Sequence, residues 1–274
     1  MTQDERLCYL VEAFRAESEE YKQLSGSNRA EMQTILRALM NVRAPGEMDQ
    51  AVLEIQDTYL RQRAVEKGIV TLQDIPTVKA QYGIHGAFAD TLSIWQGDIT
   101  RLGVDAIVNA ANNQMLGCFR PMHNCIDNCI HTFAGIQLRA ECARQMQKLR
   151  LRYGSDYIQP TAVPMLTDAY NLPAGKVIHV VGPIVSGTLN RSLEQELADC
   201  YRNVLDMCLE NGLSSVAFCC ISTGVFSFPN HRAAELAVET VTAWLAGHPN
   251  AMERIIFNVF KNEDLGYYED LLRP

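Results

Sequence analysis

The stretch DAIVNAAN, residues 105–112, indicates the fold of this chain. Residues 106–109 form a short, continuous apolar run, which is typical of a strand buried on both faces of a sheet. Similar runs predict further strands at Leu92–Gln96, 177–181, 216–221 and 255–260. Amphipathic helices are predicted at residues 131–150, 192–211 and 231–246. This alternation predicts an α/β fold of three layers, α/β/α, with helices on both sides of a largely parallel or mixed central sheet.

The first 75 residues contain helical patterns and little that is typical of strands. The patterns lie around residues 7–14, 32–40 and 47–66. Asn28 and Glu31 have the spacing of a capping box, and Gly68 is a suitable stop for the third helix. The sequence therefore predicts a helical extension, residues 1–75, followed by an α/β domain, residues 76–274. We expect the extension to pack on the main domain or to form an oligomer contact; substrate selection is the alternative.

Composition and charge exclude several classes of protein. The 274 residues are 47% hydrophobic and carry a net charge of −8, which argues against nucleic acid as a partner. No apolar run approaches the length of a membrane span, and the acidic N-terminus does not resemble a signal peptide, so we expect a cytoplasmic protein that does not bind membranes. The chain has nine cysteines, which is an odd number, and it is too large to need disulfides for its stability. Both points favour reduced thiols over a disulfide framework. Dinucleotide, phosphate-loop and metalloprotease motifs are absent from the sequence.

The densest cluster of reactive side chains is GCFRPMHNCIDNCIH, residues 117–131. Cys118, His123 and Cys125 have the types and spacing of zinc ligands in a loop. The alternative is a set of ordinary buried thiols with one buried histidine, because free cysteine is among the most buried residue types. A fourth ligand from Cys129 would close the tetrahedron, whereas three ligands leave a position for substrate or water. We expect Cys129 and His131 instead to face the packing side of a helix that begins near residue 126.

Two further segments contain candidate binding residues. Residues 221–229, ISTGVFSFP, follow a predicted strand and precede a predicted helix, so their backbone N–H groups could bind a phosphate without lysines. Many such turns bind nothing, and this alternative stays open. Residues 95–100, WQGDIT, place Asp98 in a turn, where its carboxylate could accept from an exocyclic amine or cap the local backbone.

Taken together and in this order, these segments resemble a macrodomain, the ADP-ribose-binding α/β module. The matching segments are 97–100 (GDIT), 105–112 (DAIVNAAN), 134–135 (AG), 172–183 (LPAGKVIHVVGP), 200–201 (CY) and 221–229 (ISTGVFSFP). Residues 117–125 replace the family's glycine-rich loop. Only Ile126, Asp127 and Asn128 correspond to the last part of that motif. This replacement resembles the zinc-containing macrodomain branch found in microbes, which also has an N-terminal helical extension.

The resemblance implies a role for each matching residue. Asp98 would bind the adenine amine and Ile99 would be its neighbouring backbone contact, with Phe260 a looser candidate for the adenine wall. Asn112 would reach the distal ribose, on which Phe226 would pack, and Asp127 stands at the position of the catalytic acid residue. The diphosphate would be wrapped by Ser222, Thr223, Gly224, Val225 and Phe226. Zinc would be held by Cys118, His123 and Cys125.

The implied reaction is zinc-dependent removal of mono-ADP-ribose from proteins modified on acidic side chains, by cleavage at the distal ribose. Zinc would act as a Lewis acid, and either Asp127 or a zinc-bound water would transfer the proton and activate the attacking water. The expected partners are ADP-ribose and an ADP-ribosylated protein. Two alternatives use the same pocket: a reader that binds ADP-ribose without turnover, and a deacetylase of O-acetyl-ADP-ribose.

Overall fold

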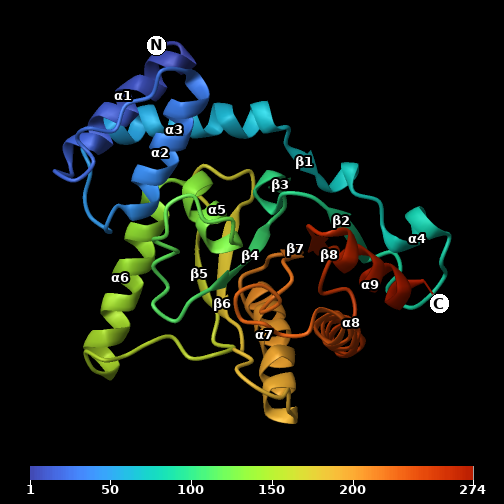
Figure 1. Ribbon diagram of the computed structural model, residues 1–274. Helices are drawn as coiled ribbons and strands as arrows, with labels where there is room; N and C mark the ends of the chain where they lie inside the picture. The colour runs from blue at the N-terminus through green and yellow to red at the C-terminus, as the bar shows by residue number, and fades with distance from the viewer. Residues whose placement is uncertain (274) are drawn as a thin grey trace. The chain divides into compact units, whose positions relative to one another are not determined.

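A computed structural model describes residues 1–273 (Figure 1). Contacts within it divide the chain into two compact units. The helical unit comprises Met1–Gly68, Gln114–Tyr157 and Ala169–Leu172. The sheet unit comprises Ile69–Asn113, Ile158–Asp168 and the described residues from Pro173 onward. These compact units do not coincide with residues 1–75 and 76–274, because the segment from Gln114 to Tyr157 groups with the N-terminal helices. The division into domains at residue 75 stays a prediction.

The sheet unit contains a mixed six-stranded sheet. Its order is β2 (Leu92–Gln96), β8 (Arg254–Val259), β7 (Ser215–Phe218), β4 (Ala106–Ala111), β6 (Lys176–Val181) and β5 (Met165–Asp168). The first five strands are mutually parallel, and β5 pairs with β6 in the antiparallel direction. A separate parallel pair joins β1 (Val70–Thr71) to β3 (Leu102–Gly103). All five predicted strands are present, although β7 ends at Phe218 and leaves the sheet before residue 221.

Helices flank this sheet, which confirms the predicted α/β class. The helices of the sheet unit are α4 (Val78–Tyr82), α7 (Arg191–Glu210), α8 (Asn230–Gly247) and α9 (Asn262–Leu272). Helix α7 contacts β6, and α9 contacts β2 and β8. Helix α8 lies beside both α7 and α9 (Figure 1). Short 3₁₀ helices occur at Leu72–Asp74 (η1) and Ile99–Arg101 (η2). No helix within residues 1–273 is long and apolar enough to cross a membrane.

The helical unit contains α1 (Gln3–Ala16), α2 (Arg29–Val42), α3 (Gln50–Lys67), α5 (Ile126–Ala134) and α6 (Ile136–Tyr153). The single helix predicted at 131–150 is wrong, because the chain breaks at Gly135 between α5 and α6. The predicted capping box at α2 is also incomplete. Asn28 accepts from the Glu31 amide, but the Glu31 carboxylate accepts from the Ser27 amide rather than from that of Asn28.

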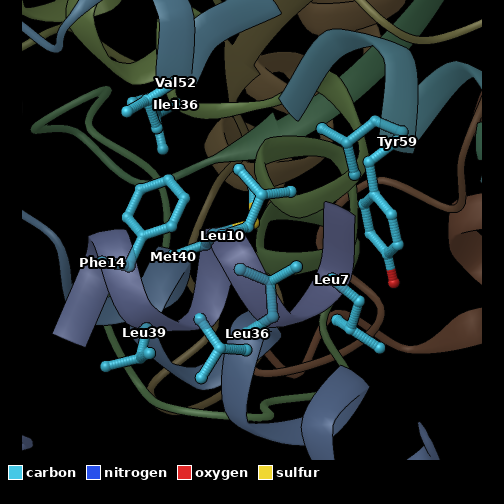
Figure 2. Close-up of a cluster of buried hydrophobic side chains, with 11 residues drawn as sticks. Leu7, Leu10, Phe14, Leu36, Leu39, Met40, Val52, Tyr59 and Ile136 are labelled. Atoms are coloured by element: carbon cyan, nitrogen blue, oxygen red, sulfur yellow. The ribbon is translucent and has the colours of Figure 1, made fainter. Parts of the chain in front are cut away.

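Figure 2 shows the apolar core of the helical unit. Its labelled side chains are Leu7, Leu10 and Phe14 of α1, Leu36, Leu39 and Met40 of α2, Val52 and Tyr59 of α3, and Ile136 of α6. All are less than a tenth exposed. The three N-terminal helices therefore share one core with the first residue of α6.

Candidate active site

The carboxyl ends of the five parallel strands lie at one edge of the sheet, where open α/β sheets bind ligands. The segments that leave this edge are Gly97–Asp98 after β2, Asn112 after β4, Gly182 after β6, the 219–229 turn after β7 and Phe260 after β8. The structure therefore brings the predicted residues Asp98, Asn112 and Ser222 to the same edge of the sheet. Phe260 is 77% exposed, and Asn112 is half-buried.

The turn after β7 has the features of an anion site. The Phe228 amide donates to the Ser222 carbonyl (3.0 Å), and the Ser227 amide donates to the Gly224 carbonyl (3.1 Å), so the turn is internally braced. The amides of Gly224, Val225 and Phe226 donate to no acceptor within residues 1–273. Neighbouring N–H groups without protein acceptors form the concavity in which backbone amides bind a phosphate.

Ser222 occupies an unusual position in this turn. Its φ of +65° lies in the left-handed region, and the residue is 5% exposed. Its Oγ atom is buried and has no hydrogen-bond partner among the residues that the structure describes. A buried hydroxyl without a partner costs free energy, and strained, unsatisfied groups of this kind cluster at ligand sites.

Gly182 allows the segment after β6 to lie against this turn. A Cβ atom at Gly182 would lie 2.1 Å from Ser222 Oγ and 2.7 Å from Ile221 Cγ2. Only glycine permits such a close approach of the backbone. The position of Ser222 thus depends on a glycine at the neighbouring strand end.

Asp98 is a helix cap in this structure. Its Oδ1 atom accepts from the Thr100 amide (3.0 Å) and the Thr100 hydroxyl (2.6 Å) at the start of η2, in which Ile99 is buried. The capping interpretation is confirmed, and the adenine role stays a prediction. Asn258 fixes the same turn by donating to the carbonyls of Trp95 (3.2 Å) and Gly97 (3.0 Å). Sequence reasoning missed Asn258, because its position in a buried strand gives no local signal of this contact.

Cys118, His123 and Cys125 form one group of donor atoms in the helical unit. One ligand atom from each lies within 4.8 Å of the others, and Cys118 Sγ is 3.6 Å from His123 Nδ1. Zn–S and Zn–N bonds of about 2.3 and 2.1 Å at a tetrahedral angle require a sulfur–nitrogen edge of about 3.6 Å. All three side chains are half-buried. The three donors therefore match zinc in their chemical types and in this sulfur–nitrogen distance. Neither Cys129 nor His131 belongs to this group.

The start of α5 positions the third donor. Cys125 is the N-cap residue of α5, and its Sγ atom accepts from the Asn128 amide (3.4 Å). Burial raises the pKa of the Cys125 thiol to about 12; the Asn128 amide opposes this rise and the nearby Cys118 adds to it. A bound cation would instead favour the charged thiolate of Cys125, which is the form that binds a metal.

Gly117 lies close to His131 just before the loop that carries the three donors. Gly117 has a φ of +79°, and a Cβ atom there would lie 2.8 Å from the His131 ring. His131 is buried, and its Nε2 atom is 3.6 Å from Asp127 Oδ1. Asp127 is also buried, in the first turn of α5. The structure thus places Asp127 beside His131 on α5, as their spacing of four residues requires.

The sequence and the fold are similar to those of known proteins. The sequence matches the family model of the Macro domain over residues 108–237. It is 45% identical over 273 residues to a protein of Treponema medium named protein-ADP-ribose hydrolase, covering 99% of this chain and 100% of that protein. A protein of the same name from Staphylococcus aureus strain Mu50 is 38% identical over 269 residues, covering 97% of this chain and 95% of that protein. The crystal structure of the Trypanosoma brucei macrodomain in complex with ADP-ribose is similar with a TM-score of 0.64 at 28% identity, covering 86% of this chain and 94% of that one.

Proposed function

The chain belongs to the macrodomain family and is a hydrolase, and we propose that it removes mono-ADP-ribose from proteins modified on acidic side chains, with zinc as cofactor. The proposed dependence on zinc is supported by one observation, which is the grouping of Cys118, His123 and Cys125 in the segment between Asn112 and Asp127. A protein that only binds ADP-ribose needs complementarity to the ligand and no metal. A hydrolase must also stabilise charge that develops in the transition state.

The residues at the sheet edge would bind the ADP-ribose part of the substrate. The free amides of Gly224, Val225 and Phe226 and the buried Ser222 hydroxyl supply donors for the diphosphate, which suits a protein of net charge −8. Thr223 would contribute through its place in the same turn. On the adenine side, Asp98 would accept from the exocyclic amine beside Ile99. Asn112 would donate to or accept from a distal ribose hydroxyl, and the Phe226 ring would pack on that ribose.

Cys118, His123 and Cys125 would hold the metal. When bound with an open position, zinc supplies Lewis-acid stabilisation of negative charge on oxygen. Asp127 would accept a proton from the attacking water as the bond between the anomeric carbon and the carboxylate oxygen of the modified side chain breaks. The products are ADP-ribose and the free carboxylate of the protein.

The chemistry of the leaving group supports the acidic linkage. An Asp or Glu carboxylate has an ordinary pKa of about 4, so it leaves without protonation at neutral pH. An arginine linkage would release a guanidine, whose conjugate acid has a pKa above 12 and which is therefore a much poorer leaving group than a carboxylate. Activation of water by one carboxylate therefore favours the acidic linkage over the arginine linkage.

The experiment compares two substrates of the same carrier protein. One is mono-ADP-ribosylated through Glu or Asp and the other through Arg, and release of free ADP-ribose by the purified zinc-loaded chain is measured. We expect release from the acidic linkage alone. Absence of release from both would contradict the hydrolase, and release from the arginine linkage alone would contradict the proposed substrate class.

A further inference from the structure

The loop between Cys118 and Cys125 is held by side chains rather than by its own backbone. Its one internal backbone hydrogen bond among the described residues joins the His123 amide to the Arg120 carbonyl (3.3 Å). The buried Asn128 of α5 donates to the Cys118 carbonyl (3.3 Å) and the Arg120 carbonyl (3.0 Å). Because a loop without its own ladder of hydrogen bonds has many conformations, the groups that satisfy its carbonyls and amides determine where its donor atoms lie.

Arg37 of α2 holds both the loop and its support. Its Nη2 atom donates to the His123 carbonyl (2.9 Å) and to Asn128 Oδ1 (3.0 Å), and it lies 3.7 Å from Cys129 Sγ. One guanidinium nitrogen therefore connects the backbone of a donor residue to the amide that braces the loop. The contact with Cys129 keeps that thiol directed at α2.

Asn41, one turn after Arg37 on α2, makes a second connection of the same kind. Its amide nitrogen donates to Thr132 Oγ1 of α5 (2.8 Å), and its Oδ1 atom accepts from the Met122 amide in the loop (3.0 Å). Asn41 is 1% exposed. Residues four apart on a helix share one face. The face of α2 that carries Arg37 and Asn41 thus contacts the loop and α5 together.

Arg139 of α6 connects the segment just before the loop to the end of α2. It donates to the Leu116 carbonyl (2.8 Å) and to the carbonyls of Met40 (3.1 Å) and Asn41 (2.9 Å). Its guanidinium carbon also lies 4.3 Å from the centre of the Phe119 ring. The loop is therefore tied to α2 at both ends, directly through Arg37 and Asn41 and indirectly through Arg139.

We propose that Arg37 and Asn41 are positioning residues of the metal site, so that the N-terminal helices complete the site that holds zinc. This inference rests on the proposed function for the identity of the metal and extends it to residues that do not touch the metal. The groups that orient metal ligands typically contribute 10–100-fold to metal affinity or activity. The helical extension is thereby assigned the role of positioning residues 118–125, the metal loop.

The test is the zinc affinity of the full-length protein, measured by competition with a chromophoric chelator, for wild type, Arg37→Met and Arg29→Met. The Arg29 variant is the matched control, because Arg29 begins the same helix and its ion pairs among residues 1–273 are with Asp4 and Glu66 of the extension. We expect Arg37→Met to bind zinc about 10–100-fold more weakly than wild type. Arg29→Met should stay within about twofold, well below that range.

Spectroscopy separates positioning from a general loss of structure. In the cobalt-substituted proteins, the visible ligand-field and thiolate charge-transfer bands report the geometry of the donors. These bands should change in Arg37→Met and stay as in wild type in Arg29→Met. Arg37→Lys, which keeps the aliphatic stem and the charge, should recover part of the zinc affinity, and it supplies the comparison if Arg37→Met does not fold.

Two results would overturn the inference. One is a wild-type protein that binds no zinc, and the other is wild-type zinc affinity and cobalt spectra in both Arg37 variants. Both measurements are independent of turnover. Weakened zinc binding in Arg37→Met supports the inference even if wild type releases no ADP-ribose, a result that would contradict the proposed function alone.

Discussion

Cys118 Sγ lies 3.6 Å from His123 Nδ1 across the loop that precedes α5. This distance suits a thiol–imidazole hydrogen bond in the metal-free protein and equally an edge of a zinc tetrahedron. The third donor, Cys125, distinguishes the two, because a hydrogen bond needs only the pair. The presence of three donors within 4.8 Å of one another therefore favours a metal site.

We predict about one zinc per chain in the purified protein, because two thiolates and an imidazole favour zinc over magnesium or calcium. Cys118→Ala, His123→Ala and Cys125→Ala should each lose the metal. Cys129→Ala should retain it, since Cys129 lies outside the donor group and beside Arg37. Elemental analysis measures the content. Loss of zinc in Cys129→Ala would instead indicate that Cys129 is a fourth ligand and that the site is closed and structural.

Much of the sheet could be predicted because its strands are short, continuous apolar runs with both faces buried. Strand β5 escaped prediction because only Met165 and Thr167 of its four residues are buried and it pairs at the edge of the sheet. The break at Gly135 escaped because apolar residues continue at helical spacing on both sides of it.

The donor residues of the metal loop could be proposed from sequence because their types and spacing are local properties. The contacts that hold the loop could not. Arg37 and His123 are far apart in the sequence, and Arg37 stands in a helix whose pattern predicts only a packing face. The pairing of such residues is decided by the tertiary structure and leaves no periodic signal.

Asp98 has a structural contact that must be separated from any ligand contact. Asp98→Asn keeps an oxygen to cap η2 but loses the carboxylate, so we expect ADP-ribose binding to weaken by about 1–3 kcal/mol with little change in stability. Asp98→Ala should in addition lose about 1 kcal/mol of unfolding free energy with the cap. Calorimetry and urea unfolding measure the two quantities. Wild-type affinity in Asp98→Asn would leave Asp98 as a cap only.

Ser222→Ala should weaken ADP-ribose binding by about 1 kcal/mol while leaving the free energy of unfolding unchanged or slightly higher, because the buried hydroxyl has no partner to lose among the described residues. Thr223→Val is the comparison for stability, because the Thr223 hydroxyl donates to the Cys220 carbonyl (3.0 Å). That variant should lose about 1 kcal/mol of unfolding free energy. Wild-type affinity together with lowered stability in Ser222→Ala would remove Ser222 from the binding site.

His179 should make stability depend on pH. Burial lowers the pKa of His179 to about 3, and the ring lies 2.9 Å from both Asn109 Nδ2 and Thr167 Oγ1. Its ordinary pKa in the unfolded chain is about 6.5. Below that pH only the unfolded state takes up the proton, so stability is fully present above pH 6.5 and is lost as the pH falls toward 3.

Between pH 6.5 and pH 5 this loss amounts to about 2 kcal/mol, at about 1.4 kcal/mol per pH unit. Urea unfolding at the two pH values measures it, and His179→Gln should show a correspondingly smaller difference. An NMR titration in which the His179 imidazole of the folded protein protonates near pH 6.5 would refute this prediction.

If the metal loop serves turnover rather than binding, its variants should release ADP-ribose slowly and still bind it, so affinity and release are measured in the same variants. Asp127→Ala and Cys118→Ala should bind free ADP-ribose within about tenfold of wild type, or about 1.4 kcal/mol. Both should release it from acidic-linked protein at least about a hundredfold more slowly, the scale of losing a general base or an electrostatic stabiliser. Wild type treated with chelator should behave like Cys118→Ala. Equal release by wild type and both variants would contradict a role of the metal loop in turnover.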